Sequence, residues 1–300
     1  MKNCRIEEQL RNQLPDYQIT QLRDSRAAST IGRRARLELV FERRGADTVL
    51  AHGYAEPPLR IGRVLSLDGA AYAILVCTGP GILAGDTLQY TIRVGVGAQV
   101  VLTSQSALQV HPSPAPAPAR IVHEYHVDAG GELYAHWDPV IPFAEARLEQ
   151  RFVLSIADDS RLYWSDALMS GRSARGEAWR FSTLAHELRL HVASRLTYLE
   201  RYDLAPLSRS VAGRWAADDA QYLATALMHH PGLHDSLAEA LHRKIDAIPG
   251  VRAAVDAVES MLIVGRLAAV AGPPFAMART QLRQSALDLI FERPNLVGRR

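Results

Sequence analysis

Histidine offers the most obvious chemistry in this sequence, which contains 11 of them. The segment from His186 to His191 reads HELRLH and superficially looks like the HExxH motif of zinc proteases. That motif needs two imidazoles four residues apart on one face of a helix. Here the spacing is five, within an alternating pattern typical of a strand, so the two rings should lie on opposite faces of a sheet. We therefore predict no metalloprotease site in this segment.

A second group of histidines, His229, His230 and His234, surrounds the turn at Pro231-Gly232. The turn could bring the three imidazoles together, and imidazole is a ligand for nickel, copper and zinc alike. Histidine is also common at exposed helix ends, where it favours the negative end of the helix dipole. The sequence leaves two interpretations open, a weak transition-metal site and a solvated helix end.

Two glycine-rich turns carry acidic residues. In the segment from Gly79 to Asp86, GPGILAGD, the Pro80-Gly81 pair fits a type II turn, because proline fixes φ and glycine supplies a positive φ. Asp86 either caps this turn or offers its carboxylate to a ligand. In the segment GRSARGE, two glycines bracket a basic tip, and Arg172 or Arg175 could form a surface pair with Glu177.

Several classes of function are excluded by what the sequence lacks. Lys2 and Lys244 are its two lysines and neither follows a glycine, so there is no Walker A loop. It contains no GxSxG, Cys–His or GxGxxG motif either. The 34 basic residues nearly balance the 32 acidic ones, for a net charge of +2, which argues against nucleic acid as the main partner.

The cysteines and the hydropathy pattern indicate a cellular compartment. Cys4 and Cys77 form neither a CxxC pair nor a disulfide framework, and the charged N-terminus has no apolar signal core. No stretch reaches the roughly 18 apolar residues that a membrane span needs. We expect a cytoplasmic protein without a membrane anchor.

The period of the apolar pattern changes along the chain. Alternation by two, as at Leu37, Leu39 and Phe41, predicts about a dozen short strands between residues 36 and 202, one of them over 179–184. This spacing is typical of an all-β sandwich, barrel or solenoid. Farther on, the pattern predicts helices over 217–229, 233–247 and 276–293, with a strand over 260–270. We expect an N-terminal extension over 1–35, a β-rich core over 36–212 and a helical part over 213–300, packed on the core as one structural unit.

Five segments, in this order, resemble those of the urease accessory protein family UreD, also called UreH. Pro58–Ile61 is similar to the family's PLRV strand, and Pro80–Asp86 is similar to its GGxxxGD turn. Leu102–Val110 is similar to its LTTQAATKV stretch, and Asp138–Phe143 to its LPdxxIxF stretch. Leu168–Trp179 is similar to its xxGRxxxGExF loop. The resemblance covers about residues 36–205 well and the C-terminal part loosely. Gln109 and His111 depart from it, because the family usually has lysine and tyrosine there.

The resemblance implies a mainly β fold, a β-helix-like stack of short-stranded sheets with a few C-terminal α-helices. It also implies a non-enzymatic scaffold that bridges apo-urease and the UreF–UreG complex for nickel insertion during urease maturation. UreG is the GTPase that brings nickel, and a water-filled tunnel through UreD is the family's proposed nickel route. We accordingly expect no tightly bound cofactor, transient contact with nickel, and a dimeric arrangement within a hetero-oligomer.

The resemblance also assigns candidate residues. The tunnel or partner candidates are Asp86, Asp138, Arg172 and Glu177, with Thr103, Ser104 and Gln105 as polar tunnel wall. The metal candidates come from the residue pattern rather than from the resemblance, and they are the histidines His229, His230 and His234. One alternative is a scaffold of the same fold that no longer serves urease, which the altered Gln109–His111 segment would fit. The other is a metallohydrolase that uses these histidines together with Asp235.

Overall fold

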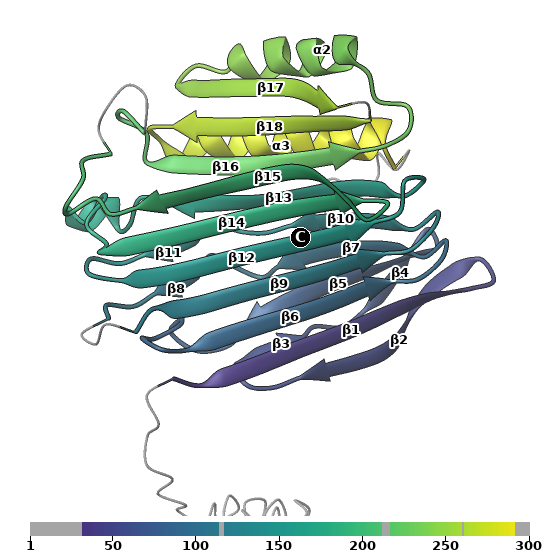
Figure 1. Ribbon diagram of the computed structural model, residues 1–300, viewed down its shortest axis with the longest axis horizontal. Coiled ribbons are helices and arrows are strands. Elements are labelled where there is room, and N and C mark those ends of the chain that lie inside the picture. Colours follow the sequence, from purple (N-terminus) through teal and green to yellow (C-terminus); the bar gives the residue numbers. More distant parts are fainter. Residues whose placement is uncertain (1–31, 114–116, 212–216, 260, 292–300) are drawn as a thin grey trace, which may run out of the picture. The chain divides into compact units, whose positions relative to one another are not determined.

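Strands in this protein alternate between two facing sheets as the chain advances, which makes the fold a β-solenoid (Figure 1). The computed structural model describes residues 32–291 apart from 114–116, 212–216 and 260. The described residues belong to one compact unit that begins at Ile31. The predicted mainly β, β-helix-like class is confirmed.

Sheet A contains seven strands, and its five inner neighbours β1, β6, β9, β12 and β14 run parallel. Antiparallel hairpin strands close both of its edges. Its members are β1 (Arg34–Arg44), β2 (Asp47–Ala55), β6 (Thr87–Val94), β9 (Ala119–Val127), β12 (Arg147–Ile156), β14 (Thr183–Val192) and β15 (Arg195–Leu204).

Sheet B has a parallel centre, β5, β7, β10 and β13, followed by the antiparallel strands β16, β18 and β17. Its long members are β5 (Ala70–Cys77), β7 (Gln99–Ser104), β10 (Glu132–His136), β13 (Arg161–Met169), β16 (Tyr222–His229), β17 (Val251–Glu259) and β18 (Leu262–Ala269). Its short members are β3 (Leu59–Ile61), β4 (Leu65–Leu67), β8 (Leu108–Val110) and β11 (Val140–Pro142).

The main hydrophobic core lies between the two sheets. Alternation by two gives each sheet A strand one buried face, as in β1, where Leu37, Leu39 and Phe41 are at most 1% exposed. Trp164 of β13 packs edge-on against Phe152 of β12 across the interior, with ring centroids 5.0 Å apart. Stacking of successive solenoid turns therefore builds one continuous apolar interior.

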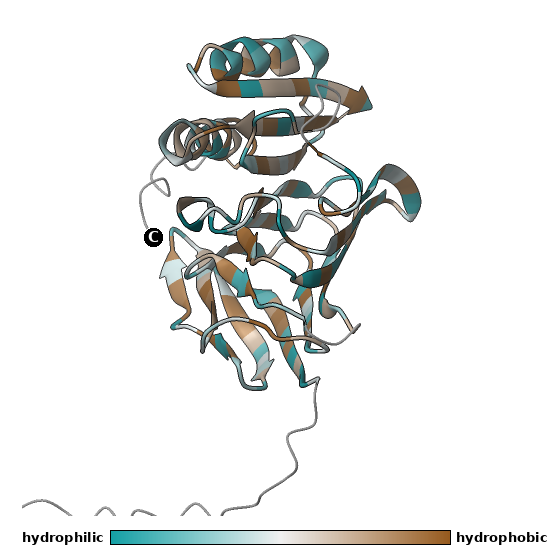
Figure 2. Ribbon diagram, turned by 90° about the vertical axis from the view of Figure 1, so that its left-hand side faces the viewer, coloured by the Kyte–Doolittle hydropathy of each residue, from teal (hydrophilic) through white to brown (hydrophobic). Residues whose placement is uncertain are grey.

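A second core covers the outer face of sheet B. The helices α2 (Asp235–Asp246) and α3 (Gly272–Leu289) pack on the terminal strands of that sheet (Figures 1 and 2). Ala238, Leu241 and Ile245 form the buried stripe of α2, and α3 buries Leu282 and Ala286. A short 3-10 turn, η1 (Ser173–Arg175), lies within the connection from β13 to β14. None of the described helices is long and apolar enough to cross a membrane.

The structure corrects two element predictions. The predicted helix over 217–229 is wrong, because Tyr222–His229 forms β16 in the middle of sheet B. This strand is buried on both faces, so it reads as a continuous apolar run that periodicity cannot tell from a helix. The predicted strand over 179–184 is also wrong for its first four residues, because β14 begins at Thr183. The described part of the segment 213–300 thus adds β16, β17 and β18 to the β-rich core and contains the helices α2 and α3.

Candidate functional site

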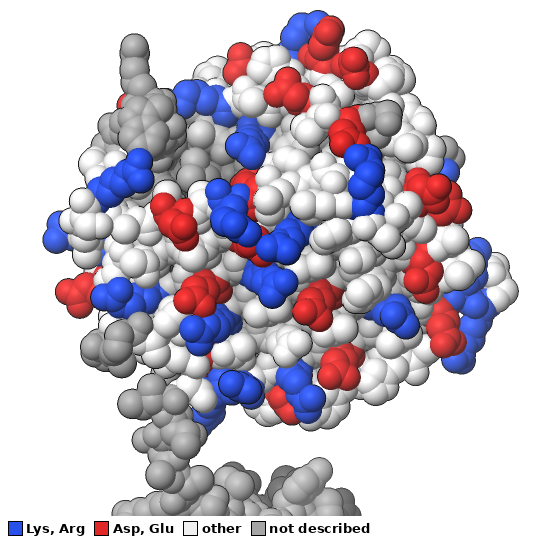
Figure 3. All heavy atoms as spheres, in the orientation of Figure 1, with Lys and Arg blue, Asp and Glu red and all other residues white. Residues whose placement is uncertain are grey.

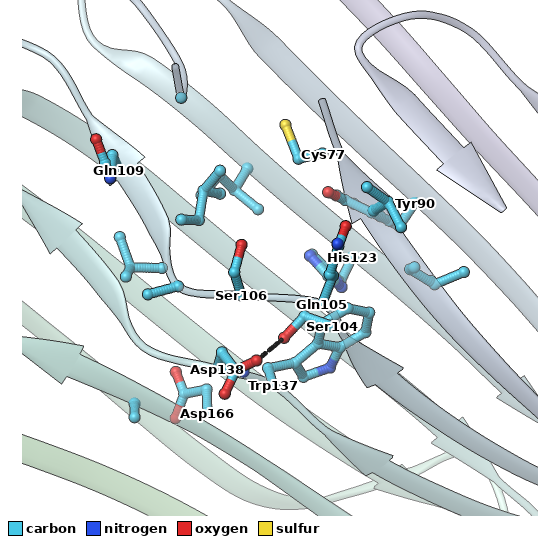
Figure 4. Close-up of a pocket in the computed structure, with 18 of the residues that line it drawn as sticks. Cys77, Tyr90, Ser104, Gln105, Ser106, Gln109, His123, Trp137, Asp138 and Asp166 are labelled. Carbon is cyan, nitrogen blue, oxygen red and sulfur yellow. Dashed lines mark hydrogen bonds between the residues drawn. The ribbon is translucent and has the colours of Figure 1, made fainter. Parts of the chain in front are cut away.

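A polar cavity of about 140 Å³ lies inside the solenoid, between sheets A and B. We call it the inner cavity. Figure 4 shows polar side chains from both sheets around it. Those that matter below are Cys77, Tyr90, Ser104, Gln105, His123, Trp137, Asp138, Gln150 and Asp166.

The inner cavity exists because polar residues occupy inward-facing strand positions. His123 of β9 takes the place between the buried Ile121 and Tyr125, and Gln150 of β12 does so between Leu148 and Phe152. These side chains are only 4% and 7% exposed. Buried polar groups are costly unless they find partners, so such positions are retained where they meet water or a ligand.

His123 forms the aromatic wall of the inner cavity. Its ring stacks on Tyr90 at a centroid distance of 4.1 Å and meets Trp137 edge-on at 4.8 Å. Its Nδ1 lies 2.8 Å from the Tyr125 hydroxyl. Burial lowers the pKa of His123 to about 3, so the ring is neutral at physiological pH.

A second, larger hollow opens between β15 and the strands β16 to β18, with a volume of about 530 Å³. We call it the groove. Its acidic side is Glu200, which accepts hydrogen bonds from Arg266 at 2.8 Å, Tyr198 at 2.7 Å and Thr225 at 3.2 Å. Alanines and leucines form much of the remaining wall.

Asp166 of β13 lines both the inner cavity and the groove. Burial, reinforced by the charge of Glu200, raises the pKa of Asp166 to about 7. His186 of β14 is its neighbour, with Nδ1 3.9 Å from Oδ2 of Asp166. The His186 ring stacks on Tyr202 at 4.6 Å, and both of its nitrogens lack hydrogen-bond partners among the described residues. Burial lowers the pKa of His186 to about 4.

This arrangement makes Asp166 a junction between two hollows. A carboxyl group with a pKa near 7 exchanges protons readily at neutral pH, and an adjacent neutral imidazole can accept a hydrogen bond or contact a cation. The HELRLH segment lies on β14, as predicted, and it supplies one inward imidazole rather than a pair.

Three of the predicted tunnel residues line the inner cavity. Asp138 is held there by Ser104, whose hydroxyl accepts from the Asp138 amide at 2.7 Å and donates to Oδ2 at 3.1 Å. Gln105 follows directly in the loop after β7. The structure thus brings Ser104, Gln105 and Asp138 together at the end of β7 and β10.

The other four candidates lie elsewhere. Asp86 accepts hydrogen bonds from the backbone amides of Arg33 and Leu83, both at 2.9 Å, and contributes to neither hollow. The Thr103 hydroxyl lies 3.5 Å from that of Tyr72, which packs in the second core on the outer face of sheet B.

Arg172 and Glu177 form a pair with two hydrogen bonds, at 2.7 and 2.5 Å. The Arg172 guanidinium also lies 3.8 Å over the Phe143 ring. These bonds hold the pKa of Glu177 below its usual value. The pair orders the loop after β13 and, like Asp86, lies outside both hollows.

The three histidines of the predicted metal site each make local contacts. His229 is buried, with Nδ1 3.1 Å from the Ser160 carbonyl oxygen. His230 accepts from the Gly232 amide at 2.9 Å, and His234 lies 2.9 Å from the Ser236 hydroxyl at the start of α2. Across residues 32–291, without the three gaps, no group of three or more histidine, cysteine or acidic side chains is arranged to hold a metal ion.

The outer face of sheet A carries interspersed charges (Figure 3). Glu187 is central to it, with Arg189, Arg201 and Arg151 at 2.9, 2.5 and 3.6 Å. Basic and acidic side chains alternate over this face instead of forming a basic patch, in line with the near balance of charge in the sequence.

Sequence reasoning missed four residues of the site, His123, Gln150, Asp166 and His186. The sequence does carry a signal for His123, Gln150 and His186, because each is a polar residue within an alternating apolar pattern. Polar residues at such positions mark an interior that is not purely hydrophobic. The sequence alone does not indicate that they lie on neighbouring strands, because that depends on the register of β9, β12 and β14.

The fold and the site define a class of protein, a β-solenoid whose interior contains polar residues from several strands of both sheets. The family model for the UreD urease accessory protein matches residues 33–299. The chain therefore belongs to the UreD urease accessory protein family.

Individual relatives agree with this assignment. The chain is 39% identical over 204 residues to a urease accessory protein UreD of Sorangium cellulosum, covering 68% of this chain and 64% of the relative. It is 36% identical over 149 residues to a UreD of Trichodesmium erythraeum, covering 48% and 53%. A UreD of Halalkalibacterium halodurans is 30% identical over 200 residues, covering 65% and 73%. The matches to the first two relatives span less than two thirds of their lengths.

Proposed function

We propose that this protein is a non-enzymatic scaffold and conduit for nickel insertion into urease. Its partners are apo-urease, on which the accessory proteins act, and a UreF–UreG complex in which UreG is the GTPase that brings nickel. It works as part of a hetero-oligomer that contains two copies of the chain. Family membership supports the urease partnership, and the resemblance noted in the sequence supports the identity of the other partners.

The observation that carries the conduit is the position of Asp166 between the inner cavity and the groove. A cation that passes through a protein needs oxygen and nitrogen contacts that are too few to retain it. Ser104, Asp138 and His123 offer such contacts around the inner cavity, Glu200 offers them in the groove, and His186 lies beside Asp166. Nickel is cargo in this scheme rather than a resident cofactor.

Plugging the inner cavity tests this proposal. Ser106 lines the inner cavity and is exposed, so Ser106→Trp should obstruct the entrance without disturbing the core. Ser66→Trp, at an exposed position of β4 away from both hollows, is the matched control. Both variants would be used to pull down the accessory proteins and apo-urease from the same cells, and urease activity would be divided by the amount of complex recovered.

We expect Ser106→Trp to assemble normally and to lower activity per complex about tenfold, the effect of about 1.4 kcal/mol of added barrier. Ser66→Trp should match the wild type in both measures. Equal activity per complex in both variants would contradict the conduit. Failure of the wild type to recover any urease maturation partner would instead favour the alternative of a scaffold that no longer serves urease.

A further inference from the structure

Arg279 of α3 is a buried cation without a carboxylate partner. It is 7% exposed, and its Nη2 donates a hydrogen bond to the Trp137 carbonyl oxygen at 2.5 Å. Its Nε has no hydrogen-bond partner. No carboxylate of the described residues forms an ion pair with it. A buried charge without a counterion is destabilising, so its presence needs an explanation beyond packing.

The carbonyl that Arg279 binds belongs to the wall of the inner cavity. Trp137 lines that cavity, and Asp138 follows it directly with its own amide fixed by Ser104. The hydrogen bond from Arg279 therefore fixes the backbone of Trp137 and Asp138 from the side of helix α3, while the inner cavity lies on the opposite side.

Two carboxyl groups of the inner cavity lie within range of the Arg279 charge. Asp138 and Asp166 both interact electrostatically with it through the wall. Neither forms an ion pair with any arginine or lysine of the described chain, and the His186 near Asp166 is neutral. One permanent positive charge thus stands behind two acids. In a poorly screened interior, this charge opposes the attraction that the acids exert on an entering dication.

We infer that Arg279 is a positioning residue of the conduit, which fixes the Trp137–Asp138 wall and keeps divalent cations weakly bound by placing a positive charge behind Asp138 and Asp166. This inference depends on the proposed function for its biological meaning, but it concerns cation affinity and can be measured without urease. The chemical class of the ligand is a divalent transition-metal cation, with nickel as the probe.

The test is nickel titration of the full-length protein by calorimetry, in competition with a weak chelator. Arg279→Met removes the charge at similar side-chain length, and Arg279→Lys keeps the charge but loses the planar guanidinium. Arg283→Met is the matched control, because Arg283 lies one turn farther along the same helix, whereas Arg279 is the arginine whose charge acts on Asp138 and Asp166.

We expect Arg279→Met to bind nickel at least tenfold more tightly than the wild type. Arg279→Lys at neutral pH and Arg283→Met should both stay close to the wild type. Unchanged affinity in Arg279→Met would overturn the inference, since a purely structural arginine would affect stability alone. Weaker binding in Arg279→Met would overturn it as well.

Arg279→Lys provides a second measurement if Arg279→Met does not fold. A buried lysine loses its proton at a lower pH than an exposed one, whereas arginine stays charged. Nickel affinity of Arg279→Lys should therefore rise more steeply with pH above neutrality than that of the wild type. Parallel pH profiles would refute the electrostatic role. Failure of these binding tests leaves the proposed function intact if Ser106→Trp still lowers urease activation, so the two claims fail separately.

Discussion

At the scale of single residues, Asp166 places an ionisable group at an inward-facing position of an otherwise apolar strand face. Its neighbours along β13 on the same face are Trp164 and Leu168, both buried in the main core. At this position the strand carries a carboxyl group with a pKa of about 7, beside an imidazole with a pKa of about 4. Between about pH 4.5 and 6.5 the acid is therefore protonated and the imidazole neutral, so this pair carries little net charge.

These shifts predict how stability depends on pH. Between about pH 4.5 and 6, unfolding makes His123 and His186 each take up a proton, because their folded pKa values lie below the ordinary value. Unfolding makes Asp166 release one, because its folded pKa lies above the ordinary value. The three together leave an uptake of one proton, so their joint contribution to stability should rise by about 1.4 kcal/mol per pH unit.

Asp166→Asn should double this slope, to about 2.7 kcal/mol per pH unit, because the proton released by Asp166 no longer offsets the histidines. The measurement is urea denaturation of both proteins at a series of pH values in this window. Asp166→Asn should also be more stable than the wild type above about pH 7, where the buried carboxylate is charged. Parallel curves for the two proteins would show that Asp166 titrates normally.

At the scale of elements, an acidic residue in a turn can have a purely structural role, unlike the acids that line the inner cavity. Asp86 closes the turn before β6 by accepting two backbone hydrogen bonds, from Arg33 and Leu83. Gly81 in the same turn has a φ of +125°, and a Cβ there would lie 2.3 Å from the Gln109 carbonyl oxygen. The predicted positive φ at Gly81 is confirmed, and the turn lies directly against the segment that bears the unusual Gln109 and His111.

Asp86→Ala should cost about 1–2 kcal/mol of stability, as for other lost side-chain caps. It should leave urease activity per recovered complex unchanged, because Asp86 faces neither hollow. Asp86→Asn is the matched control, since its amide oxygen can still accept one of the two bonds. Thermal unfolding and the normalised activity assay check both statements. A drop in normalised activity with unchanged stability would mean that Asp86 contacts the cargo or a partner.

Prediction from sequence succeeded where one face of an element is buried and one is exposed. Strand β1, with Leu37, Leu39 and Phe41 inward, and helix α2 both follow their expected periods. It failed for β16, whose two faces are both covered and whose apolar run carries no period. The site was predicted in part, because Ser104, Gln105 and Asp138 belong to recognisable segments. Asp166 and His186 meet only through the pairing of distant strands, which local patterns do not encode.

At the scale of the whole molecule, the C-terminal segment is an integral part of the solenoid, because it extends sheet B and covers its outer face. β13, the last parallel strand of sheet B, pairs with β16 along its full length. The second core then places α3 over Tyr134 and Tyr163 of the parallel part, and Arg161 of β13 donates to the Ile290 carbonyl oxygen at 2.8 Å. The groove, too, is formed jointly by β15 and the strands β16 to β18.

Removal of residues 213–300 should therefore abolish cooperative folding rather than release a stable β-rich core. The edge of β13 would lose its partner, and the buried aromatic face of sheet B would be exposed to water, which favours aggregation. Removal of residues 1–30 is the control and should leave the melting temperature unchanged, because the compact unit begins at Ile31. Calorimetry and binding of a hydrophobic dye measure both effects. A sharp unfolding transition and little dye binding in the protein that ends at residue 212 would show that the parallel solenoid is a domain in its own right, and that the C-terminal strands and helices serve another purpose.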